Sequence, residues 1–356
     1  MRICMLIKTL ALGGAERHVV DLAADLQRRG HSVSVLFSDV HLDALRPELV
    51  SHGVEVVGVG DGGAGGLLRD LARELRRIAP DVVHAHSPRL KFLARMLRPV
   101  LGYRLVTTYH NTFARHHPLI RLGEHLTHGM DDVRISCSQE VADTMRWPSR
   151  VVPNGIRLPS GPDGSGGLRL RLQLDAGTLL FSCVANLWQK KNHAGLVDAF
   201  ARAFGTAGGD ALPHLVLFGE GDERGALRAH IDALGIGARV HLLGADPDAA
   251  RLTSGADVFC LVSFHEGLPL ALLEAMANGL PCVVSRAGGM PTVVQHGATG
   301  LVVDATDTAA IADAMRTLAA DAGLRRAMGQ AGRQRIERDY QLSTMVDRVL
   351  ALYAAP

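Results

Sequence analysis

Short apolar runs rich in β-branched residues alternate with longer helical stretches along most of the chain, and this alternation restricts the possible folds more than any other feature. The strands expected in the first half lie at 2–10, 31–38, 54–59, 82–84, 105–109, 133–137 and 151–152. The helices expected between them lie at 15–29, 67–78 and 90–97, and the glycine-rich run 60–66 is expected to be a loop. A chain with this order of elements forms a parallel sheet with helices on both faces, so an α/β fold is predicted.

One segment rich in Gly, Pro and Ser, at 159–167, interrupts the alternation and predicts a linker. The strands expected after it lie at 179–185, 215–218, 240–243, 257–262, 283–284 and 300–303. The expected parts of the chain are an N-terminal domain at 1–157, a linker at 158–167, a C-terminal domain at 168–340 and a helix at 341–356 that packs back on the first domain. Two doubly wound, Rossmann-like domains of this kind are expected to face each other across a ligand cleft.

Composition excludes several classes of protein. The 356 residues are 47% hydrophobic and 21% charged, which is typical of a globular protein. No apolar run approaches the length of about 20 residues that spans a bilayer, and the start of the chain has no cleavage site for secretion, so a cytoplasmic location is expected. A net charge of +2 gives no basis for binding nucleic acid. None of the five cysteines lies in a C-x-x-C pair, so we expect reduced core residues.

A strand, a loop with one acid and a helix with a second acid follow one another at 257–279. Pro269 is expected in the first helical turn, where its missing N–H costs little, so Glu266 lies on the loop and Glu274 inside the helix. The unpaired N–H groups of a helix start can hold a phosphate, and the two carboxylates can accept hydrogen bonds from hydroxyls on either side of it. A sugar nucleotide has that arrangement of groups; the alternative is an acidic loop residue and one solvated helix glutamate.

The pattern E-G-x-P-x4-E-A-x-A-x-G-x-P at 266–281 resembles the Glu-x7-Glu signature of glycosyltransferase family 4, whose members are retaining enzymes of the GT-B fold. The resemblance implies transfer of a hexose or N-acetylhexosamine from a nucleoside diphosphate sugar, with uridine as the expected base, to a hydroxyl acceptor. It implies that Glu274 holds the ribose and Glu266 the donor sugar. The donor-binding positions at the helix start are then Gly267, Leu268, Pro269 and Leu270. No metal and no cofactor other than the sugar nucleotide are expected.

Two further turns resemble family motifs. Gly13 and Gly14, after the first strand, match a turn that faces the diphosphate and the acceptor. In the run N-L-W-Q-K-K-N, Lys191 matches the lysine that neutralises the departing diphosphate. Asn186 stands where the family has arginine, so one of two cations is missing. Either Lys190 compensates in part, or the leaving group is held more weakly, or the activity is specialised.

Several histidines lie at the ends of expected strands. His110 matches a family histidine that contacts the transferred sugar, so it joins Glu266 and Lys191 as an expected catalytic residue. His84 and His86 also end a strand and are expected to be structural. The order Glu-His-x-x-His at 124–128 is not the zinc motif His-Glu-x-x-His, and no metal site is predicted there.

The turn with Gly219 and Gly221 permits two interpretations. Followed by Asp246 after the next strand, it imitates a dinucleotide fingerprint. It also resembles a family turn that lies along the nucleotide, and so it does not discriminate between a transferase and a dehydrogenase. Thr292 stands where the family usually has glutamate.

The segment 88–100 carries four basic residues among apolar ones: Arg89, Lys91, Arg95 and Arg98. It is either a solvated basic helix face packed on its sheet or an interfacial helix on anionic lipid at the inner face of the membrane. The resemblance implies a sugar, polyol or lipid-linked acceptor, in bacterial glycan, glycolipid or secondary-metabolite biosynthesis. The alternatives are a GT-B-fold epimerase or phosphorylase, a dehydrogenase, and a donor-binding protein with weak catalysis.

Overall fold

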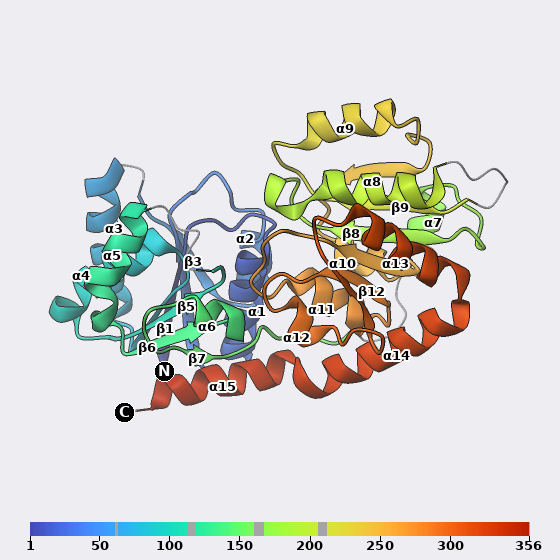
Figure 1. Ribbon diagram of the computed structural model, residues 1–356. Helices are drawn as coiled ribbons and strands as arrows, with labels where there is room; N and C mark the ends of the chain where they lie inside the picture. The colour runs from blue at the N-terminus through green and yellow to red at the C-terminus, as the bar shows by residue number, and fades with distance from the viewer. Residues whose placement is uncertain (61–62, 113–117, 160–166, 206–211, 356) are drawn as a thin grey trace. The chain divides into compact units, whose positions relative to one another are not determined.

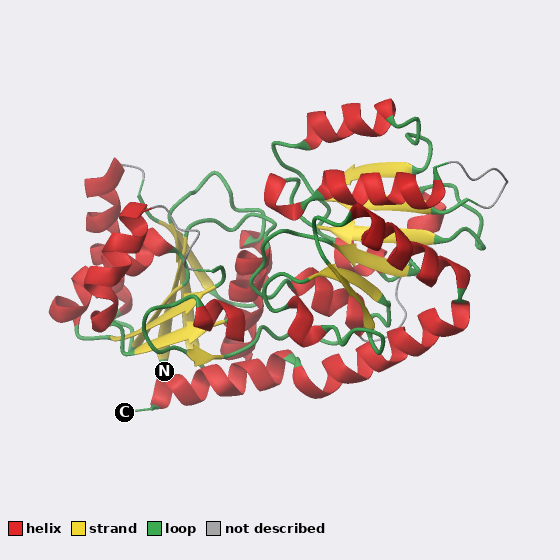
Figure 2. Cartoon of the chain, in the orientation of Figure 1, coloured by secondary structure: helices red, strands yellow, loops and turns green. Residues whose placement is uncertain are grey.

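The computed structural model describes residues 1–60, 63–112, 118–159, 167–205 and 212–355 (Figures 1 and 2). The chain forms two compact units. The first consists of Met1–Gly155 together with Leu342–Pro356, and the second of Ile156–Gln341. Residues 160–166 of the expected linker lie outside the described residues.

Within the described ranges, the first unit holds a parallel seven-stranded sheet in the order β3-β2-β1-β4-β5-β6-β7. Its strands are β1 Arg2–Ile7, β2 Ser32–Phe37, β3 Glu55–Gly58, β4 Val82–Ala85, β5 Arg104–Tyr109, β6 Val133–Ser136 and β7 Arg150–Val151. Its helices are α1 Gly14–Arg28, α2 Arg46–Ser51, α3 Gly63–Ile78, α4 Pro88–Leu101, α5 Pro118–Thr127, α6 Gln139–Asp143 and α15 Leu342–Ala354.

Side chains of β1 point alternately to two cores, one on each face of the sheet. Ile3, Met5 and Ile7 pack with residues of α1, α2 and α15. Cys4 and Leu6 pack with residues of α3 and α4. The first unit therefore has helices on both faces, as the alternation of elements predicts.

The expected loop at 60–66 is partly wrong, because α3 already begins at Gly63. A glycine in a helix costs about 1 kcal/mol relative to alanine. The stretch after Gly66 is amphipathic and buries Leu67, Leu71 and Leu75 in the core. The free energy of that burial offsets the cost of the glycines, so the helix extends back to Gly63.

The second unit, as far as it is described, holds a parallel six-stranded sheet in the order β10-β9-β8-β11-β12-β13. Its strands are β8 Leu180–Val184, β9 His214–Phe218, β10 Val240–Gly244, β11 Val258–Leu261, β12 Cys282–Ser285 and β13 Gly300–Val303. Its helices are α7 Gly167–Arg171, α8 His193–Phe204, α9 Arg224–Ala233, α10 Ala249–Thr253, α11 Leu270–Ala277, α12 Met290–Val293, α13 Thr308–Ala320 and α14 Ala322–Asp339.

Both sheets have the strand order of the Rossmann fold, so the predicted α/β fold with two parallel sheets is confirmed. Strand order reverses between β1 and β4 in the first unit and between β8 and β11 in the second. In open sheets of this kind, ligands bind at the carboxyl ends of the strands beside such a switch point. Ligand-binding residues are therefore expected at these two places.

All five cysteines are free and buried, as expected of core residues. No helix in the described part of the chain has the length and apolar character needed to cross a bilayer.

Candidate functional site

Two loops of the second unit meet at the carboxyl ends of β8 and β11. Lys191 Nζ donates to Glu266 Oε1 at 2.6 Å, and Ser263 Oγ donates to the same oxygen at 2.7 Å. The Phe264 N–H donates to the Lys190 carbonyl at 2.9 Å, which ties the two loops together. The side chains of Lys191 and Glu266 are only 15% and 8% exposed, so their attraction is weakly screened by water. The structure brings the two predicted catalytic residues of this unit into direct contact.

Asn192 holds Lys191 in this position, a role that sequence reasoning missed. Its backbone is left-handed, with φ 56° and ψ 39°, a conformation that asparagine tolerates better than most residues. Its Nδ2 donates to the carbonyls of Val262 at 3.1 Å and Ala305 at 2.8 Å. The sequence signal for this role was Asn192 itself, the asparagine that directly follows the matched Lys191.

The loop after β12 fixes the backbone of Glu266 and Gly267. The Gly289 N–H donates to the Gly267 carbonyl at 2.5 Å. Gly288 has φ +57°, and a Cβ there would stand 2.4 Å from the Glu266 carbonyl oxygen and 2.5 Å from that of Gly267. Since any side chain would clash with backbone, only glycine permits this close approach. Thr292, which replaces the family's glutamate, is exposed and donates from Oγ1 to the Gly289 carbonyl.

Helix α11 presents its N-terminus next to this pair. Pro269 is the N-cap, with φ −72° and ψ 125°, and the helix begins at Leu270. The prediction that Pro269 lies inside the first turn is therefore wrong by one residue. The proline still costs no hydrogen bond, because an N-cap N–H has no partner within the helix. Leu268 and Leu270 are buried, and Glu274 lies half-buried in the second turn.

The glycine turn after β9 packs against the loop that carries Asn186. A Cβ at Gly219 would stand 2.0 Å from the Ala185 carbonyl oxygen, and one at Gly221 would stand 2.4 Å from that of Leu187. The Leu187 N–H donates to the Glu220 carbonyl at 2.9 Å. These glycines have a local packing role, which explains the pattern without a dinucleotide.

Asp246, the acid that completes the imitation of a dinucleotide fingerprint, binds a residue of its own unit. Arg171 Nη1 donates to Asp246 Oδ2 at 2.6 Å. A ribose-binding acid has to offer its oxygens to the ligand, so this pairing does not favour the dehydrogenase alternative.

In the first unit, Gly13 is the N-cap of α1. A Cβ on it would stand 2.3 Å from Glu16 Oε2, and Glu16 Oε1 accepts a hydrogen bond from Thr9 at 2.7 Å. Gly14 is exposed, and apart from adjoining backbone no atom of the described residues lies within 4 Å of where its Cβ would be. This turn leaves open space at the first switch point.

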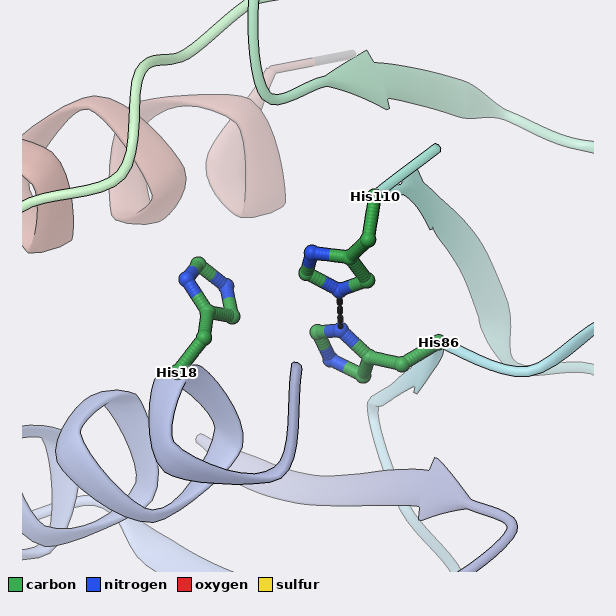
Figure 3. A group of neighbouring side chains, drawn as sticks. All are labelled: His18, His86 and His110. Carbon is green, nitrogen blue, oxygen red and sulfur yellow. Dashed lines mark hydrogen bonds between the residues drawn. The ribbon is translucent and has the colours of Figure 1, made fainter. Parts of the chain in front are cut away.

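Three histidines gather at that switch point (Figure 3). His110, after β5, and His86, after β4, are joined by a hydrogen bond of 3.0 Å between His110 Nε2 and His86 Nδ1. His18 of α1 places its ring centroid 5.0 Å from that of His110 and 5.6 Å from that of His86. His86 was expected to be structural, and the structure shows it in contact with the predicted catalytic His110. Sequence separation conceals the group, because parallel topology alone brings these positions together.

Burial keeps these rings neutral. It lowers the pKa of His18 to about 4 and holds the pKa values of His86 and His110 well below the ordinary range. His84, which was expected to be structural, is fully buried, with Nδ1 2.7 Å from the Tyr353 hydroxyl and Nε2 2.7 Å from Thr108 Oγ1. The histidines at the first switch point are thus polar groups without charge.

Two of the four basic residues of helix α4 differ from both interpretations of its sequence. Lys91 and Arg95 are buried, and burial lowers the pKa of Lys91 to about 8. Arg95 binds both oxygens of Asp131 at 2.7 Å and Glu124 Oε2 at 2.8 Å. A solvated or lipid-facing position for these two basic residues is therefore wrong. The acids that neutralise Arg95 lie later in the chain than the helix, so the helix sequence alone gave no sign of them.

Comparison with known proteins places each unit in a described family. Residues 12–158 match the family "Glycosyltransferase Family 4", and residues 169–335 match "Glycosyl transferases group 1". Over 170 residues the chain is 32% identical to N-acetyl-alpha-D-glucosaminyl L-malate synthase of Bacillus anthracis, a match that covers 48% of this chain and 44% of that protein. Over 308 residues it is 26% identical to UDP-Gal:alpha-D-GlcNAc-diphosphoundecaprenol alpha-1,3-galactosyltransferase of Escherichia coli, covering 80% and 78%.

Among solved structures, HepE of Anabaena in complex with UDP-glucose matches 98% of both chains with a TM-score of 0.87 at 20% identity. At that identity the likeness concerns the fold. Each half of the chain matches a glycosyltransferase family, and the two matches together cover most of the chain. The chain therefore belongs to the family 4 glycosyltransferases, with a Glycosyltransferase Family 4 domain followed by a group 1 domain in a GT-B fold.

Proposed function

We propose that this glycosyltransferase moves a hexose or N-acetylhexosamine from a UDP-sugar to a hydroxyl group, with retention of the anomeric configuration. The contact between Lys191 and Glu266, beside the N-terminus of α11, is the observation that carries the proposal. A cation, an acid and the N-terminus of a helix at one place suit a sugar linked to a diphosphate.

Each residue of the second unit has a role in this proposal. Lys191 and the N–H groups of Leu268 and Leu270 stabilise the negative charge that develops on the leaving diphosphate. Glu274 accepts hydrogen bonds from the ribose hydroxyls. Ser263 and Lys191 both engage Oε1 of Glu266, so we assign its Oε2 to the hydroxyls of the donor sugar.

The first unit keeps the roles that the family resemblance implies, with Gly13 and Gly14 at the diphosphate and acceptor and His110 at the transferred sugar. The name of the Escherichia coli relative includes a UDP-galactose donor and a lipid-linked acceptor, and the HepE structure contains UDP-glucose. Both support uridine as the base. We propose an acceptor used in bacterial glycan, glycolipid or secondary-metabolite synthesis, and transfer that needs no metal.

The test of the donor is a thermal-shift panel of UDP, UDP-sugars, GDP-mannose and NAD. A uridine nucleotide at a hundred times its dissociation constant stabilises by about 2.7 kcal/mol. Glu274→Gln reduces that effect, because an amide offers the ribose hydroxyls one uncharged acceptor oxygen in place of the two of a carboxylate. Stabilisation by NAD, or by no uridine nucleotide, overturns the proposal.

Product analysis separates transfer from the alternatives. A transferase releases UDP and forms a new glycoside whose anomeric configuration, measured by NMR, equals that of the donor. An epimerase changes the sugar of the donor instead, and a binding protein forms neither product. An inverted anomer contradicts retention, and loss of turnover after chelation contradicts metal independence.

We also propose that α4 and α5 contact the inner face of the membrane. The two helices pack against each other (Figure 1) and expose apolar side chains to solvent. These are Phe92, Met96 and Val100 on α4 and Leu122 and Leu126 on α5. Leu126 and Val100 are 73% and 72% exposed, and Arg89 at the start of α4 is exposed as well. Apolar side chains next to a cation suit the boundary between lipid headgroups and acyl chains.

Vesicle flotation tests this contact. We expect the protein to float with vesicles that contain phosphatidylglycerol and less with pure phosphatidylcholine. The double variant Val100→Asp and Leu126→Asp should lose binding, whereas Leu170→Asp, a change at a residue 80% exposed in the second unit, should keep it. Equal flotation of all three proteins contradicts the contact.

A further inference from the structure

His18, His86 and His110 lie in the arrangement of a metal site. One ring nitrogen from each lies within 4.8 Å of the other two. Helix α1 and the loops after β4 and β5 supply them, so three separate elements converge on one point (Figure 3). Among the described residues, no other group of three His, Cys, Asp or Glu side chains brings its ligand atoms this close together.

The distances agree with coordination of one ion. Zinc–nitrogen bonds of 2.0–2.1 Å in a tetrahedral site place two nitrogens about 3.3 Å apart. His86 Nδ1 and His110 Nε2 are 3.0 Å apart, which is close to that value. The nitrogen of His18 has to approach by at most about 1.5 Å relative to the spacing of an ideal site.

The hydrogen-bonding state of His18 favours a bound ion. Within the described residues, His18 Nδ1 is buried and has no hydrogen-bond partner. His18 is only 5% exposed, so water does not readily satisfy this nitrogen. A buried polar atom of this kind calls for a partner or an ion.

A second layer of side chains holds the group in place. The ring of His84 lies 4.1 Å from that of His86, and hydrogen bonds to Tyr353 and Thr108 fix it. Asn154 forms a side-chain hydrogen bond with His18. Such outer contacts orient the first ligands of a metal site.

The chemistry of three neutral imidazoles selects the ion. Imidazole nitrogen binds Zn²⁺, Co²⁺, Ni²⁺ and Cu²⁺ well, whereas Mg²⁺ and Ca²⁺ require oxygen ligands. We propose that His18, His86 and His110 form a three-histidine site for a divalent transition-metal ion, Zn²⁺ above all, with a fourth coordination position open to water or an anion. This inference goes beyond the proposed function and does not depend on it.

One consequence does rest on the proposed function. If His110 contacts the transferred sugar, an ion on its ring nitrogen competes with that contact. Zn²⁺ then inhibits transfer, and a chelator restores it. Metal binding without inhibition contradicts the assigned role of His110 and leaves the metal site intact, so the two ideas fail separately.

The test is a titration of metal-free, full-length protein with Co²⁺, followed by its visible absorption, and then displacement by Zn²⁺. We expect one equivalent per chain, intense d–d bands of a four- or five-coordinate ion, and no competition from Mg²⁺. His18→Gln and His110→Gln should each weaken binding more than tenfold. Two controls should keep it: His52→Gln, at an exposed residue, and His214→Gln, from the pair His214–His241, whose ring nitrogens lie 2.8 Å apart.

Several results overturn the site. These are the absence of a bound equivalent, octahedral Co²⁺ spectra, or an equal loss in the His214→Gln control. Circular dichroism checks that the variants fold. Should His18→Gln unfold, X-ray absorption of the zinc-loaded wild type decides the matter, because fewer than three imidazole ligands contradicts the proposal.

Discussion

The two units have the same strand order, and each has its own switch point where that order reverses. The residues at the two switch points have opposite kinds of chemistry. Beside β1 and β4, buried histidines have pKa values far below the ordinary range and remain neutral. Beside β8 and β11, Lys191 and Glu266 form an ion pair 2.6 Å long. Topology therefore supplies the place, and the residues at the strand ends decide what can bind.

The units also differ in where they keep charge. In the first unit, Arg95 of α4 is buried and its guanidinium is matched by protein groups, since Asp131, Glu124 and the Tyr109 hydroxyl all bind it. In the second, the buried charge stands at the ligand-binding edge of the sheet. We infer that the buried charge of the first unit stabilises the fold, whereas that of the second unit binds the ligand. Substitutions in each unit test this difference.

The largest expected effect concerns structural charge. Arg95→Met leaves Asp131 and Glu124 buried without their cation, and breaking a buried ion pair in this way costs about 3–5 kcal/mol. Urea unfolding measures the loss. The control is Arg98→Ala, one turn away, whose partner Asp132 is partly exposed, as Arg98 itself is; the loss there should stay below about 1 kcal/mol. UDP affinity that falls in Arg95→Met although the protein stays folded would contradict the purely structural role.

The next largest effect concerns the charge of Lys191, to which we assign a function. Lys191→Ala should lower kcat by about 10²–10³-fold, because a fixed positive charge no longer stabilises the leaving diphosphate. The matched control is Lys190→Ala, which removes the same charge from the neighbouring residue, whose Nζ lies 5.1 Å from the Trp188 ring centroid. Steady-state kinetics with a saturating acceptor compare the two. Equal losses would show that the loop supplies general charge and that the pair with Glu266 is not special.

One histidine makes the contrast between the units less absolute, because the charged site also contains a buried neutral ring. His193 Nε2 lies 3.1 Å from the Asn186 carbonyl, and burial lowers the pKa of His193 to about 4 from 6.5. Between these values the unfolded chain binds a proton that the folded chain does not. The contribution of His193 to the free energy of unfolding is therefore fully present above pH 6.5, and about 3 kcal/mol of it is lost as the pH drops to 4.

Chemical unfolding at pH 7 and pH 4.5 measures this loss. His193→Gln cannot titrate, so its stability should depend less on pH, while the exposed control His52→Gln should behave as wild type. A wild-type slope in His193→Gln would show that other groups account for acid sensitivity.

Sequence predicted the fold well because its signal is local. The alternation of apolar runs and helices predicts both sheets, and the spacing at 266–281 predicts the loop and helix that carry Glu266 and Glu274. The burial of Arg95 could not be predicted in the same way, since its acids follow in later elements. The meeting of His18 with His86 and His110 depends on strand order, which no local pattern contains.

The smallest expected effect arises where the second site departs from its family. Asn186 stands in place of an arginine, and its backbone is fixed by the Trp188 N–H at 2.8 Å and by His193. Asn186→Arg adds a cation at the leaving group without disturbing these backbone contacts. A charge-assisted hydrogen bond to phosphate should lower the dissociation constant of UDP about tenfold, which is about 1.4 kcal/mol.

Calorimetric titration with UDP measures the gain, and Asn186→Gln is the control for side-chain length without charge. If Lys190 already supplies the missing charge, the gain from Asn186→Arg should increase in a Lys190→Ala background, since the two cations then substitute for each other. If affinity for UDP stays unchanged in both backgrounds, residue 186 does not face the diphosphate. The functional charge of the second switch point would then rest on Lys191 and helix α11.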